Sequence, residues 1–320
     1  MNPKGGFTGE LSPDAVQTAI DTAMYETYSR EMQPGYLKAT DDYFFKQDTT
    51  DKVRFVWDED SNVGAFQATG EQEEILNSDS FVGNQTNVAS QKWTKQVPIS
   101  DEAMRADQIG KVQALGRQIG DRAKLTQDKR TILDTYADAF DGSVHTTPDG
   151  DALASNSHTT LKATTVDNLE TAALTPDALW TAVTSLANQP AQDGEAGSHL
   201  FSGLVVPFTL YKTAREILGS ELLANSSENN LNVFSTDFGD VMLRASIFLG
   251  STYNSNSNAN TSYHLISTNH MIMRKVFYDL FTKMIEPEQT ANDTYAIRAK
   301  FHESHFPGSW TGYVGCNGSA

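Results

Sequence analysis

Residues 202–218 constrain the fold more than any other part of this sequence, because they join a short apolar strand directly to a helix and carry no catalytic group. Residues 203–206 are typical of a buried strand, and Pro207 ends that strand because proline has no backbone N–H to donate. Apolar residues then recur at helical spacing as far as Leu218. The pattern predicts a small packed domain built from a strand and a helix.

Three further segments surround this one in a fixed order. Residues 175–189 are predicted to form a helix, since Thr175 suits its N-cap and Pro176 its first position. The residues expected to face inward are Leu179, Trp180, Val183 and Leu186. Downstream, residues 232–249 contain a predicted sheet segment at 241–248, and residues 294–306 are predicted to be extended.

In this order, the four segments resemble the major capsid protein of tailed bacteriophages, which has the Hong Kong 97-type fold. The resemblance covers roughly the last two-thirds of the chain, as an ordered pattern. It implies an α+β chain with an N-terminal arm at residues 1–51 and an extended loop, the E-loop, at 52–99. It also implies a peripheral domain at 100–194 and 286–320, with a spine helix at 101–140, and an axial domain at 195–285.

The resemblance also implies a function. The chain is expected to be a structural protein and not an enzyme, without a cofactor or a metal, that assembles with its own copies into the pentamers and hexamers of an icosahedral phage head. That head would enclose double-stranded DNA, assemble in the host cytoplasm and form the virion capsid with portal, scaffolding and cement proteins. The short arm favours a separate scaffolding protein, or none. The shell of an encapsulin-like compartment shares the fold and is the alternative.

Composition and charge agree with a structural role. The formal net charge is −17, from 41 acidic and 24 basic residues, which is the wrong sign for gripping phosphates. If the chain forms a DNA container, we interpret this negative charge as preventing tight binding of the duplex to the inner surface. The DNA could then slide during packing, and it would be enclosed without sequence-specific binding. No run approaches the roughly 20 apolar residues of a membrane span. Cys316 is the only cysteine, which rules out a disulfide within one subunit.

The first 99 residues predict an arm and a hairpin, neither of which is stable alone. Ser12 and Pro13 suit the start of an amphipathic helix that ends before Pro34. Such a short helix needs a docking surface on its own or a neighbouring subunit. Residues 52–99 are predicted to form a long hairpin with a poor core, stabilised by lying across another chain.

Residues 101–140 form the longest helical candidate, with Ser100 as its cap and no proline inside it. An unbroken helix of this length would span about 60 Å. Gly110, Gly116 and Gly120 are unusual there, since each glycine costs about 1 kcal/mol relative to alanine. We interpret them as sites of close approach by a packed element. The alternative is a bending point used during shell expansion.

Opposite charges on the loop and the long helix suggest a contact between subunits. The loop is acidic, without lysine or arginine between its carboxylates, at Asp58, Glu59, Asp60, Glu71, Glu73, Glu74 and Asp79. The helix is basic at Arg105, Lys111, Arg117, Arg122, Lys124, Lys129 and Arg130. Our hypothesis is that one subunit's loop lies over its neighbour's helix. The alternative is two solvated faces, because exposed ion pairs contribute only about 0–1 kcal/mol.

Aromatic residues are the other candidate contacts between subunits. The proposed anchors are Trp57, Phe66 and Trp93 on the loop, with Trp310 and Tyr313 near the C-terminus. Polar stretches at 225–230 and 254–262 are predicted to be exposed tips. The resemblance implies that they gather around the capsomer axis, as such loops do in the resembled family.

The sequence carries no recognisable motif for catalysis or metal binding. Neither a nucleophile elbow nor a phosphate loop occurs in the sequence. A calcium loop beginning at Asp58 fails because Val63 occupies the glycine position. His302 and His305, with Cys316 beyond, lack a fourth zinc ligand. Some relatives of the resembled family crosslink through a loop lysine, and none lies between residues 55 and 91 here, so we expect no such crosslink.

Overall fold

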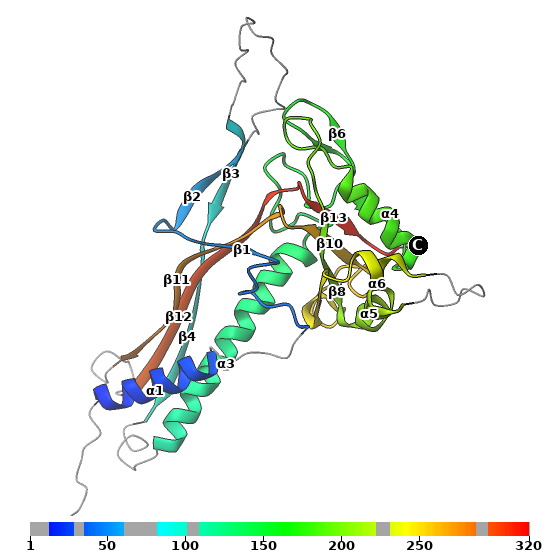
Figure 1. The fold of residues 1–320 in the computed structure, drawn as a ribbon. Coiled ribbons are helices and arrows are strands. Elements are labelled where there is room, and N and C mark those ends of the chain that lie inside the picture. The colour runs from blue at the N-terminus through cyan, green and yellow to red at the C-terminus, as the bar shows by residue number, and fades with distance from the viewer. Residues whose placement is uncertain are drawn as a thin grey trace, which may run out of the picture. The chain divides into compact units, whose positions relative to one another are not determined.

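The computed structural model describes residues 13–28, 35–60, 82–100, 109–221, 231–285 and 294–319 (Figure 1). The chain divides into two compact units. Unit 1 comprises Met1–Met32, Ser90–Gln127 and Val276–Glu303. Unit 2 comprises Gln33–Ala89, Asp128–Lys275 and Ser304–Ala320. Three elements contribute residues to both units: the helix α3 (Ile109–Ile132) and the strands β11 (Met271–Ile285) and β12 (Tyr295–Ser309).

Unit 1 packs two helices against an antiparallel sheet. Strand β4 (Gln91–Ile99) pairs with β12 from Tyr295↔Ile99 to Glu303↔Gln91, and β11 borders β12 on its other side. The core contains residues of the sheet, of α3 and of α1 (Pro13–Tyr28). These residues are Ile20, Met24, Ile99, Ile119, Ala123, Leu280, Ile297, Ala299 and Phe301.

Helix α1 docks closely on α3, as Figure 1 shows, and two glycines of α3 permit the approach. A Cβ on Gly116 would lie 2.9 Å from the carbonyl oxygen of Ile20, and one on Gly120 would lie 2.6 Å from that of Met24. The interpretation of these glycines as sites of close approach is therefore confirmed. The Tyr25 hydroxyl also donates to the carbonyl oxygen of Leu280 at 3.0 Å, so the arm helix docks on its own subunit.

Unit 2 contains a five-stranded sheet in the order β7-β13-β10-β8-β9. These strands are β7 (Leu169–Glu170), β8 (Phe201–Pro207), β9 (Met242–Ser246), β10 (Tyr263–Ser267) and β13 (Tyr313–Cys316). Strand β10 runs antiparallel to β8 and β13, whereas β8 and β9 are parallel, as are β7 and β13. The predicted end of the strand at Pro207 is confirmed, and helix α5 (Tyr211–Gly219) follows through the 3-10 turn η2 (Phe208–Leu210).

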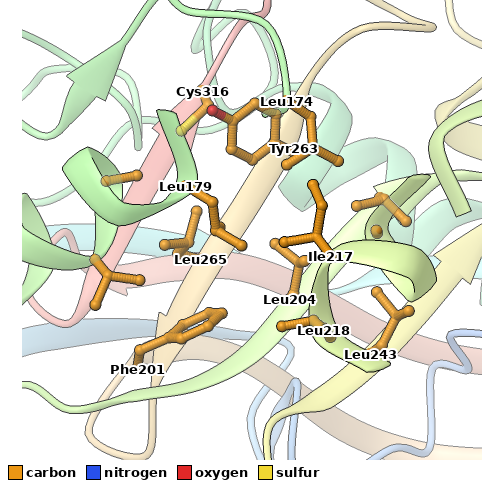
Figure 2. Packing of buried hydrophobic residues seen from close by; sticks show 14 of the residues in the cluster. Leu174, Leu179, Phe201, Leu204, Ile217, Leu218, Leu243, Tyr263, Leu265 and Cys316 are labelled. Carbon is orange, nitrogen blue, oxygen red and sulfur yellow. The ribbon is translucent and has the colours of Figure 1, made fainter. Parts of the chain in front are cut away.

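Two apolar clusters surround this sheet. Three helices build the first: α4 (Pro176–Ala187), α5 and α6 (Val233–Asp237). Figure 2 shows Leu179 and Ile217 from these helices beside Leu204 and Leu265 from the strands. The second cluster includes Phe44, Tyr136 and Ile266, and draws on the π-helical turn η1 (Leu133–Ala137) and the 3-10 turn η3 (Ile247–Leu249).

A two-stranded hairpin also belongs to unit 2. Strands β2 (Arg54–Asp60) and β3 (Val82–Ala89) pair from Arg54↔Ala89 to Asp60↔Val82, and residues 61–81 between them lie outside the described part. The prediction of a hairpin is thus confirmed for its root. It was wrong for β4, which leaves the hairpin and pairs with β12, because its apolar side chains pack in the core of unit 1 with residues of α1, α3 and β12.

The remaining short elements lie in unit 2. Strand β1 (Lys46–Thr49) borders β11, and β5 (His158–Thr159) pairs with β6 (Thr165–Val166). Among the described residues, no helix combines the length and apolar character that crossing a membrane requires.

Two predictions at the helices need correction. The long helix was predicted to reach residue 140, but it ends in η1 at Ala137, and the Asp138 carboxylate then accepts backbone N–H bonds from Ser143, Val144 and His145. Trp180 was predicted to face inward. It is 48% exposed, because the buried stripe of α4 runs through Leu179, Ala182, Val183 and Leu186 and leaves Trp180 beside it.

Gly120→Ala should lower the free energy of unfolding by about 1–3 kcal/mol, although alanine favours a helix, because the new methyl overlaps the Met24 carbonyl. Urea unfolding followed by helical circular dichroism measures the change. Asp121→Ala, at the next and exposed position of α3, is the control and should change stability by less than about 0.5 kcal/mol. Equal stability of the two variants would contradict the close contact.

Candidate functional site

A groove of about 440 Å³ lies between α3 and the sheet of unit 1. Its lining residues are Trp93, Thr94, Lys95, Val97, Leu115, Gln118, Ile119, Arg122, Ala123, Thr126, Leu280, Ala299 and Phe301. Trp93 and Phe301 are cross-strand partners on β4 and β12, and their rings stack with centroids 6.4 Å apart. The groove therefore has an apolar lining with a paired aromatic element.

Two cations border this groove. Lys95 on β4 and Arg122 on α3 are both exposed, and neither forms an ion pair with another residue in the described part of the chain. Thr94, Gln118 and Thr126 add polar groups at the same border. An apolar lining with a cationic rim fits a peptide segment that combines apolar side chains with carboxylates. The apolar side chains would pack on the lining, and the carboxylates would pair with the cations at the rim.

The structure brings together only some of the predicted contact residues. Trp93 and Arg122 line the groove, and Arg117 is exposed on α3. Lys111 lies on α3, but its side chain is outside the described part, as is that of Asp60 on β2. The candidates that fall wholly outside the described residues are Phe66, Glu71, Glu73, Glu74 and Arg105.

Two other candidates lie at the hairpin root in unit 2. Trp57 donates from Nε1 to the carbonyl oxygen of Gly308 at 2.9 Å and packs edge-on against Phe306, with centroids 5.6 Å apart. The ring is thus partly committed to its own subunit. Asp58, the next residue on β2, is exposed.

Trp310 and Tyr313 need correction as interface anchors. Both are 0% exposed, so their rings have no surface to offer to a neighbour. Trp310 stacks on the His158 ring with centroids 5.1 Å apart, and the Tyr313 hydroxyl lies 2.7 Å from His264 Nδ1. Both aromatic residues belong to the interior of unit 2.

A loop clamp around Asp149 was missed at the sequence level. Asp149, Asp151 and His158 offer ligand atoms within 4.8 Å of one another, a spacing that a metal ion could use. However, His158 Nδ1 lies 2.8 Å from Asp149 Oδ2, and its Nε2 lies 3.2 Å from the Leu153 carbonyl oxygen. The other Asp149 oxygen accepts from the Thr147 hydroxyl at 2.5 Å. Because these atoms already have partners, we assign them to closing the loop.

His302, His305 and Cys316 do not form a cluster in the described structure. His302 stacks on Tyr278, with centroids 5.3 Å apart, whereas His305 Nδ1 lies 3.8 Å from an Asp134 oxygen. Cys316 is buried in the β13 strand of the other sheet, and burial raises the pKa of its thiol.

One comparison with known proteins shows the family, and the solved structures show the fold. The sequence model described as phage capsid protein matches residues 83–299. Among solved structures, the capsid of an empty GTA particle is similar at a TM-score of 0.56 and 10% identity, covering 90% of this chain and 92% of that one. The mature capsid of bacteriophage PhiM1 is similar at 0.54 and 9%, covering 90% of each chain.

A virus-like particle from Pyrococcus furiosus is also similar, at a TM-score of 0.51 and 9% identity, covering 93% of this chain and 98% of that one. At these identities, each likeness shows the fold alone. No curated protein matches the sequence.

Asp149→Asn should lower the free energy of unfolding by about 2 kcal/mol at pH 7, because a buried hydrogen-bonded charge is removed from beside His158. Burial alone would raise the pKa of Asp149, but hydrogen bonds from His158 and Thr147 lower it below the ordinary 3.8. The stabilisation is therefore present above pH 3.8 and is lost as the pH falls through the lower folded value.

Unfolding in urea at pH 7 and at acid pH tests this prediction. The difference between wild type and Asp149→Asn should shrink at acid pH. Asp151→Asn, a partly exposed position in the same loop, is the control. A difference that is the same at both pH values would contradict the role of the Asp149 charge.

Proposed function

This chain belongs to the phage capsid protein family and has the Hong Kong 97-type fold, and from this premise we propose that its copies form the pentamers and hexamers of an icosahedral head around double-stranded DNA. The observation that carries the proposal is the family match across residues 83–299, which includes nearly all of β3, the whole of α3 and the whole proposed axial domain at 195–285. The subunit thus acts as a structural protein of the virion capsid.

The encapsulin-like alternative has no observation that favours it. The TM-score to the Pyrococcus furiosus particle is lower than those to the PhiM1 and GTA capsids, and the family match is to phage capsid proteins.

The segment 61–81 of one subunit is the proposed occupant of the groove on its neighbour. Its sequence carries four carboxylates and no lysine or arginine, together with Phe66, Ile75, Leu76 and Phe81. Apolar side chains on Trp93 and Phe301, with carboxylates toward Lys95 and Arg122, would satisfy both parts of the groove. Each such contact is modest, and repetition over many subunits would make the shell stable.

Other features of the proposal concern the domains and partners. The arm at 1–51, the loop at 52–99, the peripheral domain at 100–194 and 286–320 and the axial domain at 195–285 are the proposed parts of the subunit. Portal, scaffolding and cement proteins are its proposed partners, with assembly in the host cytoplasm. An acidic subunit is expected to bind duplex DNA weakly. A tight, salt-sensitive complex of free subunits with DNA would therefore contradict the proposal that the enclosed duplex slides along the inner surface of the shell.

Expressed wild-type protein should form hollow polyhedral particles in negative-stain electron microscopy and should sediment as a large species. This outcome tests the proposed function itself. A chain that stays monomeric at all protein and salt concentrations would contradict it.

Reversing the charges on either side should test the groove contact. Glu73→Lys with Glu74→Lys, and separately Lys95→Glu with Arg122→Glu, should each reduce the fraction of assembled protein by about tenfold or more, because attraction becomes repulsion at every repeated contact. The variant that carries all four changes should recover assembly, since the charges are again opposite. Sedimentation and electron microscopy give the assembled fraction.

The control is Lys162→Glu with Lys212→Glu, which changes the same charge at two exposed lysines of unit 2. Normal shells from both reversed variants, or a quadruple variant as defective as its parents, would refute the groove contact. Neither result would affect the family assignment, because the wild-type protein would still assemble.

A further inference from the structure

Glu59 is a carboxylate in the interior of unit 2, at the end of strand β2. Side chains of a strand alternate between its faces, and Phe55, Trp57 and Glu59 share the inward one. Glu59 is only 4% exposed, whereas Asp58 beside it is exposed. A buried glutamate in a chain with 41 acidic residues needs an account of its own, because acidic groups are almost never fully buried without a partner.

A bulge in the hairpin places Glu59 there. Asp58 pairs with Gln85 and Asp60 pairs with Val82, so the register between β2 and β3 shifts at Glu59. Gly83 allows the strands to approach, since a Cβ on it would lie 2.5 Å from the Glu59 carbonyl oxygen. Bulges commonly redirect a side chain in this way.

One carboxyl oxygen of Glu59 has two hydrogen bonds and the other has none. Oε1 accepts from the Ser309 hydroxyl at 2.5 Å and from Gln192 Nε2 at 2.6 Å. Oε2 is buried without a hydrogen-bond partner in the described structure. Ser309 ends β12 and Gln192 lies in the segment after α4, so a single carboxyl oxygen ties the hairpin root to two other parts of unit 2.

This geometry suits a protonated carboxyl better than an ionised one. A buried carboxylate with one oxygen that accepts no hydrogen bond loses most of the hydration free energy that it has in the unfolded chain. A neutral carboxylic acid loses much less hydration free energy on burial. Burial accordingly raises the pKa of Glu59 from 4.5 to about 7, although the hydrogen bonds from Ser309 and Gln192 act in the opposite direction.

Two titratable groups face Glu59 from the elements packed around it. Asp149 raises the pKa of Glu59 and His158 lowers it, whereas Ser309 and Gln192 bring no charge. Asp149 and His158 are themselves hydrogen-bonded to each other, so their opposing effects come from one pair that joins the loop at Asp149 to the first residue of β5.

We propose that Glu59 is a proton-operated latch for the hairpin β2–β3. With the carboxyl protonated, the hairpin root is held on Ser309 and Gln192. When the proton passes to solvent, the buried charge weakens this hold and the root opens more often. Opening exposes the carboxylate to water, which removes the penalty of its burial.

The sign of the pH dependence follows from linkage. The folded pKa is above the unfolded one, so the closed hairpin binds more protons than the open one between pH 4.5 and about 7. Closure is therefore strongest below pH 4.5, weakens as the pH rises and levels off above about 7. The effect on shells rests on the proposed function, because the hairpin carries the segment 61–81.

Hydrogen exchange of the full-length subunit under non-assembling conditions tests the latch. Protection of peptides from residues 54–60 and 82–89 should fall by roughly 50-fold between pH 5 and pH 8, after correction for the intrinsic exchange rate. In Glu59→Gln, which keeps the shape without the titration, protection should be nearly independent of pH. Asp58→Asn, at the exposed neighbouring position, is the matched control and should behave as wild type.

A second variant keeps the test decisive if Glu59→Gln does not fold. Ser309→Ala removes a hydrogen bond that lowers the pKa of Glu59, so the loss of protection should move to higher pH. Infrared difference spectra should show a protonated carboxylic acid band at pH 6 that vanishes at high pH in the wild type.

The latch is refuted if Glu59→Gln keeps the pH dependence of the wild type, if Asp58→Asn loses it, or if Ser309→Ala leaves its midpoint unchanged. These measurements use free subunits. A failure of the latch is therefore distinguishable from a failure of shell assembly, which electron microscopy reports.

Discussion

The structure depends on two long strands, each of which contributes side chains to apolar cores in both units. Strands β11 and β12 have 15 residues each, and a strand of that length spans about 50 Å, more than one small core needs. β12 gives Ile297 and Phe301 to the core of unit 1 and Phe306 to the hairpin root in unit 2. The groove and the hairpin root are therefore built on the same strand, although they belong to different units.

Carboxylates in this acidic chain have different environments that give them different chemistry. Asp58 is exposed and keeps its hydration, so it can contribute to solubility or to a weak contact. Burial raises the pKa of Asp149, but its hydrogen bonds outweigh burial and hold that pKa below the ordinary value. At Glu59, burial with one oxygen lacking a hydrogen bond raises the pKa to about 7. The net charge of −17 describes none of these differences, because each depends on burial and on hydrogen-bond donors.

Features set by local chemistry could be predicted from the sequence, and features set by distant partners could not. The strand before Pro207 and the helix beginning at Pro13 were predictable, because proline acts on its own backbone. Gly120 was recognised as unusual, but only the position of α1 identifies its neighbour as Met24. β4 pairs with β12, some 200 residues away in sequence, and no short-range pattern reveals that pairing. Trp180 is exposed and Trp310 is buried, and neither could be read from the sequence, because burial depends on which distant residues pack against each ring.

Glu59 shows this limit most sharply at the candidate sites. In sequence it is one of three consecutive acidic residues, and grouping it with Asp58 as a surface charge was reasonable. Strand alternation alone would place Glu59 on the inward face. A carboxylate is stable there only if hydrogen-bond donors are present to accept from. The donors here, Ser309 and Gln192, lie 250 and 133 residues away in the sequence. The groove is different, because Trp93 and Arg122 were both singled out on the sequence and only their proximity was unknown. Residue type can therefore nominate a contact surface, whereas a buried polar site is recognised only when its partners are in place.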